Sequence, residues 1–410
     1  MKRVVVTGMG AVSPVGNDVA TLWDSLVAGR HGFAPITRFD TTDMKVKLAA
    51  EVKGFEPEKY MDKAEIRRWD LFSQYGMAAA VQAVEESGIV GAVDPLRLGV
   101  YIGSGVGGIT TFINEANTLF TRGPQRISPF FVPMMIINMA SALVAMRFDA
   151  KGPSLPVVSA CSSGANAIGE AFHAIKYGQA DAIITVGTEA CVNPLAVGGF
   201  TNSQALTTRD DPDSISIPFD KRRDGFVIGE GAGIIVLEEL EHAQARGAHI
   251  YAEIVGYGNT NDAYHITAPD PDAAGSTNMI RIAFEEAGLT PDEHLYINAH
   301  GTSTPLNDKT ETLAIKQALG DAAYQAHVSS TKSMTGHMLG AAGGVEAIAA
   351  IKVLETGVVV PTIGLHESDP DCDLDYTPNV AVHADIDKAL STSLGFGGHN
   401  AGVLFKKLES

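Results

Sequence analysis

Short runs of β-branched residues, each ending at a glycine or a polar turn and alternating with longer amphipathic segments, constrain this chain most. The clearest of these runs cover residues 4–7, 98–102, 182–186, 234–237 and 296–299. Between them, residues 19–27 and 70–87 are typical of helices, and Asn17 is the expected cap of the first. This alternation predicts an α/β fold whose strands are mostly buried between helical layers.

A faint internal repeat raises the question of whether the fold is duplicated. Residues 3–8 and 252–258 both have the pattern of a strand ending in glycine. Residues 161–165 and 336–340 each lead into a predicted helix containing the sequence Ala-Ile-Lys. A duplicated αβ unit explains both pairs of similar segments, and chance similarity between glycine-rich segments explains them almost as well.

Charge and cysteine content narrow the class of protein. With 48 acidic and 30 basic residues the net charge is −18, which opposes attraction to nucleic acid or anionic membranes, so an acidic partner would need a local basic patch. Three cysteines are an odd, sparse set that fits a reducing compartment. The apolar run near the N-terminus is too short for a signal peptide, and no run reaches the roughly 18 residues of a membrane span. We therefore expect a cytoplasmic protein without membrane insertion.

Cys161 has the setting of a nucleophile. Residues 156–161 have the pattern of a buried strand that runs into a sharp turn, and a helix with an apolar face follows. The free N–H groups and the macrodipole of a helix N-terminus favour a thiolate, so the thiol pKa should fall. An isolated cysteine is more often a buried structural thiol, and the small neighbours of Cys161 are what favour the nucleophile.

Two histidines follow predicted strands. His300 lies where the strand at 296–299 enters a loop rich in small hydroxyl residues, the usual place for a functional side chain on a rigid scaffold. His337 follows a second predicted strand and Lys332, and comes just before a helix. The positive end of that helix should favour neutral imidazole.

Two glycine turns have candidate roles. Residues 395–400 follow a predicted strand, carry Phe396, and could present backbone N–H groups to an oxyanion or form a bulge before the last strand. Residues 103–108 have the glycine spacing of a dinucleotide loop. Glu115 is too close and Asp149 too far away to be the ribose partner, so nucleotide binding is disfavoured.

Taken together, the segments around Cys161, His300, Lys332–His337 and Phe396 resemble the β-ketoacyl synthase family of condensing enzymes, and its class II members most. The similarity runs nearly end to end. It implies a thiolase-like fold of class α/β, in which two duplicated αβαβα halves form a single five-layered catalytic unit. We expect one half to be residues 1–249, with the nucleophile, and the other to be residues 250–410, with the catalytic histidines. Such a duplication would account for the faint internal repeat.

The resemblance also implies an acyltransferase reaction of fatty acid synthesis. Cys161 would take an acyl chain from acyl carrier protein, and malonyl carrier protein would then be decarboxylated and condensed with it. The product would be a 3-oxoacyl chain two carbons longer. No cofactor or metal is expected, because the phosphopantetheine arm arrives on the carrier protein. The family further implies a homodimer.

Individual roles follow from the same resemblance. His300 and His337 would assist decarboxylation, and Lys332, paired with Glu346, would order the site electrostatically. The N–H groups of Cys161 and Phe396 would form the oxyanion hole, with the Phe396 ring as a gate. The residues expected to contact substrate are Val106, Phe131, Phe200, Thr267, Thr302 and Thr304, with Phe131 near the pocket of the partner. Lys63, Arg67 and Arg68 would dock the acidic carrier protein, although a solvated helix face explains them equally well.

Several relatives are alternatives. A degradative thiolase should have a second catalytic cysteine in a glycine turn near the C-terminus, and Cys372 lies outside any such turn. A non-catalytic chain-length subunit would be expected to lack Cys161. A polyketide-pathway ketosynthase shares every catalytic residue and stays open.

Overall fold

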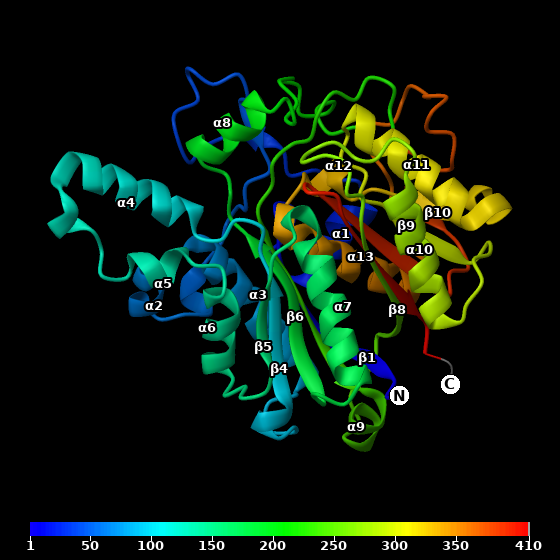
Figure 1. Cartoon of the computed structure of the whole chain (residues 1–410), viewed down its shortest axis with the longest axis horizontal. Coiled ribbons are helices and arrows are strands. Elements are labelled where there is room, and N and C mark those ends of the chain that lie inside the picture. The colour runs from blue at the N-terminus through cyan, green and yellow to red at the C-terminus, as the bar shows by residue number, and fades with distance from the viewer. Residues whose placement is uncertain (409–410) are drawn as a thin grey trace.

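The computed structural model describes residues 1–408, and its centre is a ten-stranded sheet (Figure 1). From one edge to the other the strands are β10 (His327–Ser329), β9 (Leu295–Asn298), β13 (Lys388–Gly395), β14 (His399–Lys406), β8 (Ala252–Asn261), β1 (Val4–Val12), β7 (Gly231–Glu239), β6 (Ala182–Glu189), β4 (Leu98–Gly103) and β5 (Ser154–Val157). Two small sheets pair β2 (Ala34–Pro35) with β3 (Leu48–Ala49) and β11 (Val358–Val359) with β12 (Val382–His383).

The order of the large sheet is symmetric about its central strands, β8 and β1. Outward from β1, the pairings with β7, β6, β4 and β5 are antiparallel, antiparallel, parallel and parallel. Outward from β8, the pairings with β14, β13, β9 and β10 follow the same sequence. The faint repeat in the sequence therefore corresponds to a duplicated sheet pattern. The boundary at residues 249 and 250 stays a prediction.

The helices give the layers. α3 (Leu71–Ser87) covers the outer face of the first half, against β1, β7 and β6, and α10 (Ala274–Ala287) covers the second, against β8 and β14, with α11 (Pro305–Leu319) beside it. Between the halves lie α7 (Ser163–Lys176) and α13 (Ala342–Thr356), which contact each other and strands of both halves. This α-β-α-β-α order is the expected five-layered fold.

Burial on both faces explains the apolar character of the central strands. Every residue of β1, β6 and β7 is buried, as strands covered by helices on both faces require. Gly10 allows the close approach of α3, since a Cβ there would lie 2.0 Å from the Ala79 carbonyl oxygen. The strands and helices predicted from the sequence all overlap observed elements, although residue 299 lies just beyond β9 and residue 70 just before α3. The strand before Cys161 was predicted to be buried, and this was wrong: β5 ends at Val157, lies at the edge of the sheet, and its residues are exposed or half-buried.

One cap differs from the prediction. Asp18, not Asn17, caps α1 (Val19–Val27), because its carboxylate accepts a hydrogen bond from the Thr21 N–H at 2.7 Å. The Asn17 amide instead donates to the Lys53 carbonyl oxygen. The remaining helices are α2 (Lys63–Arg68), α4 (Ile109–Arg122), α5 (Phe131–Met135), α6 (Met139–Arg147), α8 (Pro194–Asn202), α9 (Leu240–Ala245) and α12 (Lys332–Thr335). In Figure 1, α4 and α5 extend from one side of the body. No helix within residues 1–408 is long and apolar enough to cross a membrane.

Candidate active site

Cys161 lies on a single turn of 3-10 helix, Ala160–Ser162, that joins the end of β5 to α7. Serine hydroxyls hold this turn: that of Ser162 donates to the Ser159 carbonyl oxygen and that of Ser163 to the Ala160 carbonyl oxygen, both at 2.7 Å. Ala160 has a φ of 52°, an uncommon conformation that reverses the chain just before the cysteine. The turn therefore presents the half-buried Cys161 at the start of α7.

A cleft of about 480 Å³ opens at Cys161 and is walled by both halves of the chain. The predicted site residues in its lining are Cys161, Phe200, Thr267, His300, Thr302, Thr304, His337 and Phe396. Lys332 and Glu346 lie behind the histidines, outside the lining, and Val106 and Phe131 also lie outside it. The sequence did not single out Phe226 or Asn400, which line the cleft as well.

The Cys161 thiol is less acidic than the sequence predicted. Burial raises its pKa to about 11, against the opposing effects of the Lys332 charge and of the Phe396 and Cys161 N–H groups. The prediction of a lowered pKa was wrong, because loss of hydration outweighs the start of the helix. Cys161 therefore rests as a thiol, with two backbone N–H groups directed at its sulfur.

His300 and His337 are two buried rings set edge to face, with centroids 5.2 Å apart. The Lys332 ammonium lies 3.3 Å from His300 Nδ1, and the Leu339 N–H donates to His337 Nδ1 at 3.3 Å. An ammonium and a backbone N–H can only donate, so each Nδ1 is an acceptor. The proton of each neutral ring is therefore on Nε2, which leaves two N–H donors.

Both imidazoles are held neutral. The pKa of each lies well below the usual value, first because burial removes hydration and second because of the Lys332 charge. The neutral form is the one predicted for His337, but its causes are burial and Lys332 rather than the neighbouring helix. Lys332 is itself buried and forms an ion pair with Glu346 on α13.

Carboxylates on α11 hold the His300 loop. Glu311 accepts hydrogen bonds from the N–H groups of His300 and Gly301, both at 2.7 Å, and Asp308 accepts from the Thr302 N–H at 3.0 Å. Burial raises the pKa of Glu311 to about 7. Our sequence analysis did not single out Glu311 or Asp308. Their signal was two acidic residues three positions apart at the start of the helix that follows His300.

Phe396 lies at the tip of the β13–β14 hairpin, where residues 396–398 form a turn between paired strands rather than a bulge. Its ring centroid is 6.3 Å from that of Phe200. The Gly397 N–H donates to the Ile266 carbonyl oxygen, which ties the turn to the loop that carries Thr267. The two loops at this side of the cleft are therefore hydrogen-bonded to each other.

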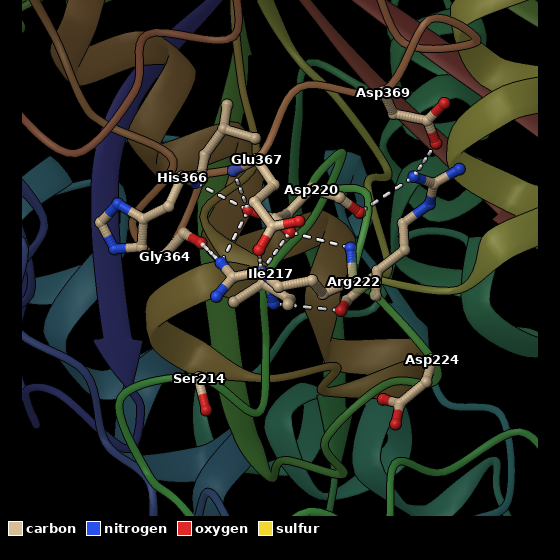
Figure 2. Close-up of polar contacts among 12 residues, drawn as sticks. Ser214, Ile217, Asp220, Arg222, Asp224, Gly364, His366, Glu367 and Asp369 are labelled. Carbon is tan, nitrogen blue, oxygen red and sulfur yellow. Dashed lines mark hydrogen bonds and ion pairs between the residues drawn. The ribbon is translucent and has the colours of Figure 1, made fainter.

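The loop that enters the cleft at Asp224 and Phe226 is anchored by buried charge (Figure 2). Asp220 is fully buried and accepts hydrogen bonds from the His366 and Glu367 N–H groups and from the Arg222 side chain. Hydrogen bonds from Arg222 and from these N–H groups hold the Asp220 pKa far below its usual value, against burial, which raises it. This cluster fixes one wall of the cleft.

The expected docking residues lie on α2. Lys63, Arg67 and Arg68 are all exposed, and the Arg68 guanidinium lies 4.9 Å from the centroid of the Phe130 ring. No residue of α2 lines the cleft. Within residues 1–408, no group of three or more His, Cys, Asp or Glu side chains could hold a metal ion.

Known proteins match the whole length of the chain, and two family models match most of it. The model described as "Beta-ketoacyl synthase, N-terminal domain" matches residues 1–243, and "Beta-ketoacyl synthase, C-terminal domain" matches residues 251–366. The 3-oxoacyl-[acyl-carrier-protein] synthase 2 of Staphylococcus aureus (strain COL) is 52% identical over 410 residues, covering 100% of this chain and 99% of that protein. The protein of the same name from Synechocystis sp. is 51% identical with the same coverage.

Solved structures are also similar. A beta-ketoacyl synthase from Burkholderia phymatum superposes with a TM-score of 0.93 at 34% identity, and the ishigamide ketosynthase/chain length factor with 0.93 at 36%. The ketosynthase AntDE, solved in complex with the acyl-carrier protein AntF, has a TM-score of 0.90 at 33% identity. Each of these three matches covers 100% of both chains.

Proposed function

Because this chain belongs to the β-ketoacyl synthase family, we propose that it is a 3-oxoacyl-[acyl-carrier-protein] synthase of class II, which elongates fatty acids by two carbons. The observation that carries the proposal is the convergence, in one cleft, of the Cys161 sulfur with two neutral histidines that each keep an Nε2–H donor. Such a set suits a reaction that forms a thioester and then an enolate.

In the first half-reaction, the Cys161 sulfur attacks the thioester carbonyl of an acyl chain on its carrier protein. Negative charge develops on the carbonyl oxygen, and the N–H groups of Cys161 and Phe396 are the donors that stabilise it. The pantetheine sulfur leaves with the proton that the cysteine loses. The Phe396 ring, beside Phe200, acts as a gate between this step and the next.

In the second half-reaction, the cleft takes a malonyl thioester. The Nε2–H groups of His300 and His337 donate to its thioester oxygen, so carbon dioxide leaves while an enolate forms. The enolate carbon attacks the Cys161 thioester, a carbon-carbon bond forms, and the cysteine departs as a thiolate that regains a proton. Lys332 keeps its positive charge in an ion pair with Glu346. That charge helps to keep both imidazoles neutral, and the contact with Nδ1 orients His300.

The proposal includes the partners. The AntDE ketosynthase was solved in complex with its acyl-carrier protein, and we extend this partner to the present chain, with docking at Lys63, Arg67 and Arg68. The phosphopantetheine arm comes with the carrier, so no other cofactor or metal is part of the proposal. A cytoplasmic homodimer completes it, in which Val106 borders the acyl pocket and Phe131 the pocket of the partner.

Intact mass spectrometry tests the proposal. Purified protein is mixed with a long-chain acyl carrier protein, then with malonyl carrier protein, and the products are analysed. We expect an acyl adduct on Cys161 that malonyl carrier protein converts into a 3-oxoacyl product, with Cys161→Ala as the control without adduct. No adduct on folded protein at any chain length would contradict it. An adduct whose product is extended repeatedly by malonyl units would indicate the polyketide alternative.

A further inference from the structure

The glycine loop at residues 103–108, which has the spacing of a phosphate-binding loop, already holds an anion of the protein itself. Glu189 accepts hydrogen bonds from the N–H groups of Gly105 at 2.7 Å, Val106 at 3.2 Å and Gly107 at 3.3 Å. The Ser104 hydroxyl donates to the same carboxylate at 2.9 Å. Successive N–H groups that converge in this way form an anion-binding nest, and here a carboxylate occupies it.

Glu189 is an unusual residue for its position. It ends β6, a strand whose every residue is buried, and is itself 0% exposed. Within residues 1–408 no lysine, arginine or histidine lies within ion-pair distance of it, whereas Glu346 and Glu238, equally buried, each have a cation. Burial raises the pKa of Glu189, and hydrogen bonds from N–H and O–H groups oppose this rise, with the Cys191 thiol as a further donor. Each such bond to a carboxylate is stronger than a neutral one.

The same carboxylate reaches the second half of the chain. Glu189 Oε2 also accepts from the Gly340 N–H at 3.1 Å. The neighbouring Leu339 N–H donates to His337 Nδ1, the contact that fixes the tautomer of that ring. One side chain thus holds the loop that carries Val106 and the segment that orients His337.

The nucleophile turn lies against this cluster. A Cβ on Gly105 would be 3.0 Å from Glu189 Oε2 and 3.3 Å from the carbonyl oxygen of Ala160, the residue before Cys161. A Cβ on Gly340 would be 2.6 Å from the Gly105 nitrogen. The backbones at Gly105, Ala160 and Gly340 are packed closely around Glu189. A change in the length of the Glu189 side chain must therefore move them.

We propose that Glu189 is a positioning residue, an ionised carboxylate that holds the glycine loop and the segment after His337 in one fixed arrangement beside Cys161. Glu189 does not touch substrate. This role rests on the proposed function, since it assigns Glu189 to the orientation of His337 for decarboxylation.

Two substitutions distinguish the effect of the Glu189 charge from the effect of its side-chain length. Glu189→Gln preserves size, but its amide places two hydrogens against N–H donors; Glu189→Asp keeps the charge and is one methylene shorter. We expect both to lower kcat for decarboxylation of malonyl carrier protein about tenfold, with KM within about twofold of wild type. The pH midpoint of Cys161 alkylation should fall only in Glu189→Gln, because the negative charge of Glu189 raises the Cys161 pKa.

A matched control is Glu238→Gln, which removes a fully buried carboxylate at the opposite end of the β6–β7 pair. It should lower the melting temperature and leave both the kcat and the alkylation midpoint unchanged. If Glu189→Gln keeps the wild-type kcat, or shifts the alkylation midpoint no more than Glu189→Asp does, the role assigned to Glu189 is wrong. A wild-type protein that alkylates normally but forms no 3-oxoacyl product would instead contradict the proposed function.

Discussion

The two halves of the molecule share a backbone plan and differ in chemistry. In each half a proposed catalytic side chain comes shortly before a central helix: Cys161 precedes α7, and His337 precedes α13. The turn at Cys161 is held by serine hydroxyls, whereas the segment at His337 lies among buried charges, including the Lys332–Glu346 pair. The duplicated fold thus supplies two equivalent positions facing one cleft, one occupied by the proposed nucleophile and the other by a proposed proton donor.

Removal of the nucleophile should have the largest effect. Cys161→Ala should reduce acyl transfer by more than about 10⁴-fold, because no other group in the cleft can form the thioester. Decarboxylation of malonyl carrier protein, which depends on the second half, should continue. Intact mass spectrometry and a carbon dioxide assay measure the two reactions. Loss of both in a folded variant would show that the halves do not divide the chemistry.

Removal of either histidine should have the opposite pattern. His300→Ala or His337→Ala should slow decarboxylation about 10²- to 10³-fold, the usual effect of losing a donor to a developing oxyanion. Acylation of Cys161 should change by less than about tenfold. Single-turnover rates of the two half-reactions give the comparison. Equal losses in both would indicate that the histidines have a structural role.

Replacing one partner of the buried Lys332–Glu346 ion pair should lower the free energy of unfolding far more than replacing both partners. Lys332→Met leaves Glu346 as an unpaired buried charge and should lower the free energy of unfolding by about 3–5 kcal/mol. The double variant Lys332→Met/Glu346→Gln should recover most of that loss. Denaturant titration of both variants measures it. A double variant no more stable than the single one would contradict this account of the pair.

The smallest predicted effect is on pH dependence. Because the pKa values of His300 and His337 lie well below 6.5, decarboxylation by the wild type should show no histidine titration between pH 8 and the usual histidine pKa of about 6.5. In the double variant the Lys332 charge is gone, so both pKa values rise and an acid limb should appear at higher pH than in the wild type. Rates across this pH range test the sign, and an acid limb that moves to lower pH would contradict it.

The sequence predicted the parts of the site that are local in the chain. The runs at 4–7, 98–102 and 182–186 lie within β1, β4 and β6, and the elbow at Cys161 leads into a helix as expected. These features depend on alternating residue types and on small residues at turns, which a sequence displays directly. The resemblance of four motifs placed the cleft residues, since their spacing is specific even where contacts are not visible.

What the sequence could not predict depends on contacts between distant segments. The Cys161 pKa is set by burial under both halves, and Lys332 lies 171 positions away in the chain. Glu189 gave only one local signal, an acidic residue shortly after the strand-like run at 182–186. Its donors come from residues 104–107 and 340. Burial and partners of this kind arise from packing, which no local pattern encodes.

The central position of β1 has a consequence for synthesis on the ribosome. One edge of β1 pairs with β7, which is complete at residue 239, and the other pairs at Val4–Val6 with residues 252–254 of β8. A nascent chain that has emerged only as far as β7 can fold its first half, but it leaves an apolar valine edge without its neighbour. A translational pause in that interval should therefore favour aggregation or chaperone capture, and translation through β8 supplies the missing neighbour of β1.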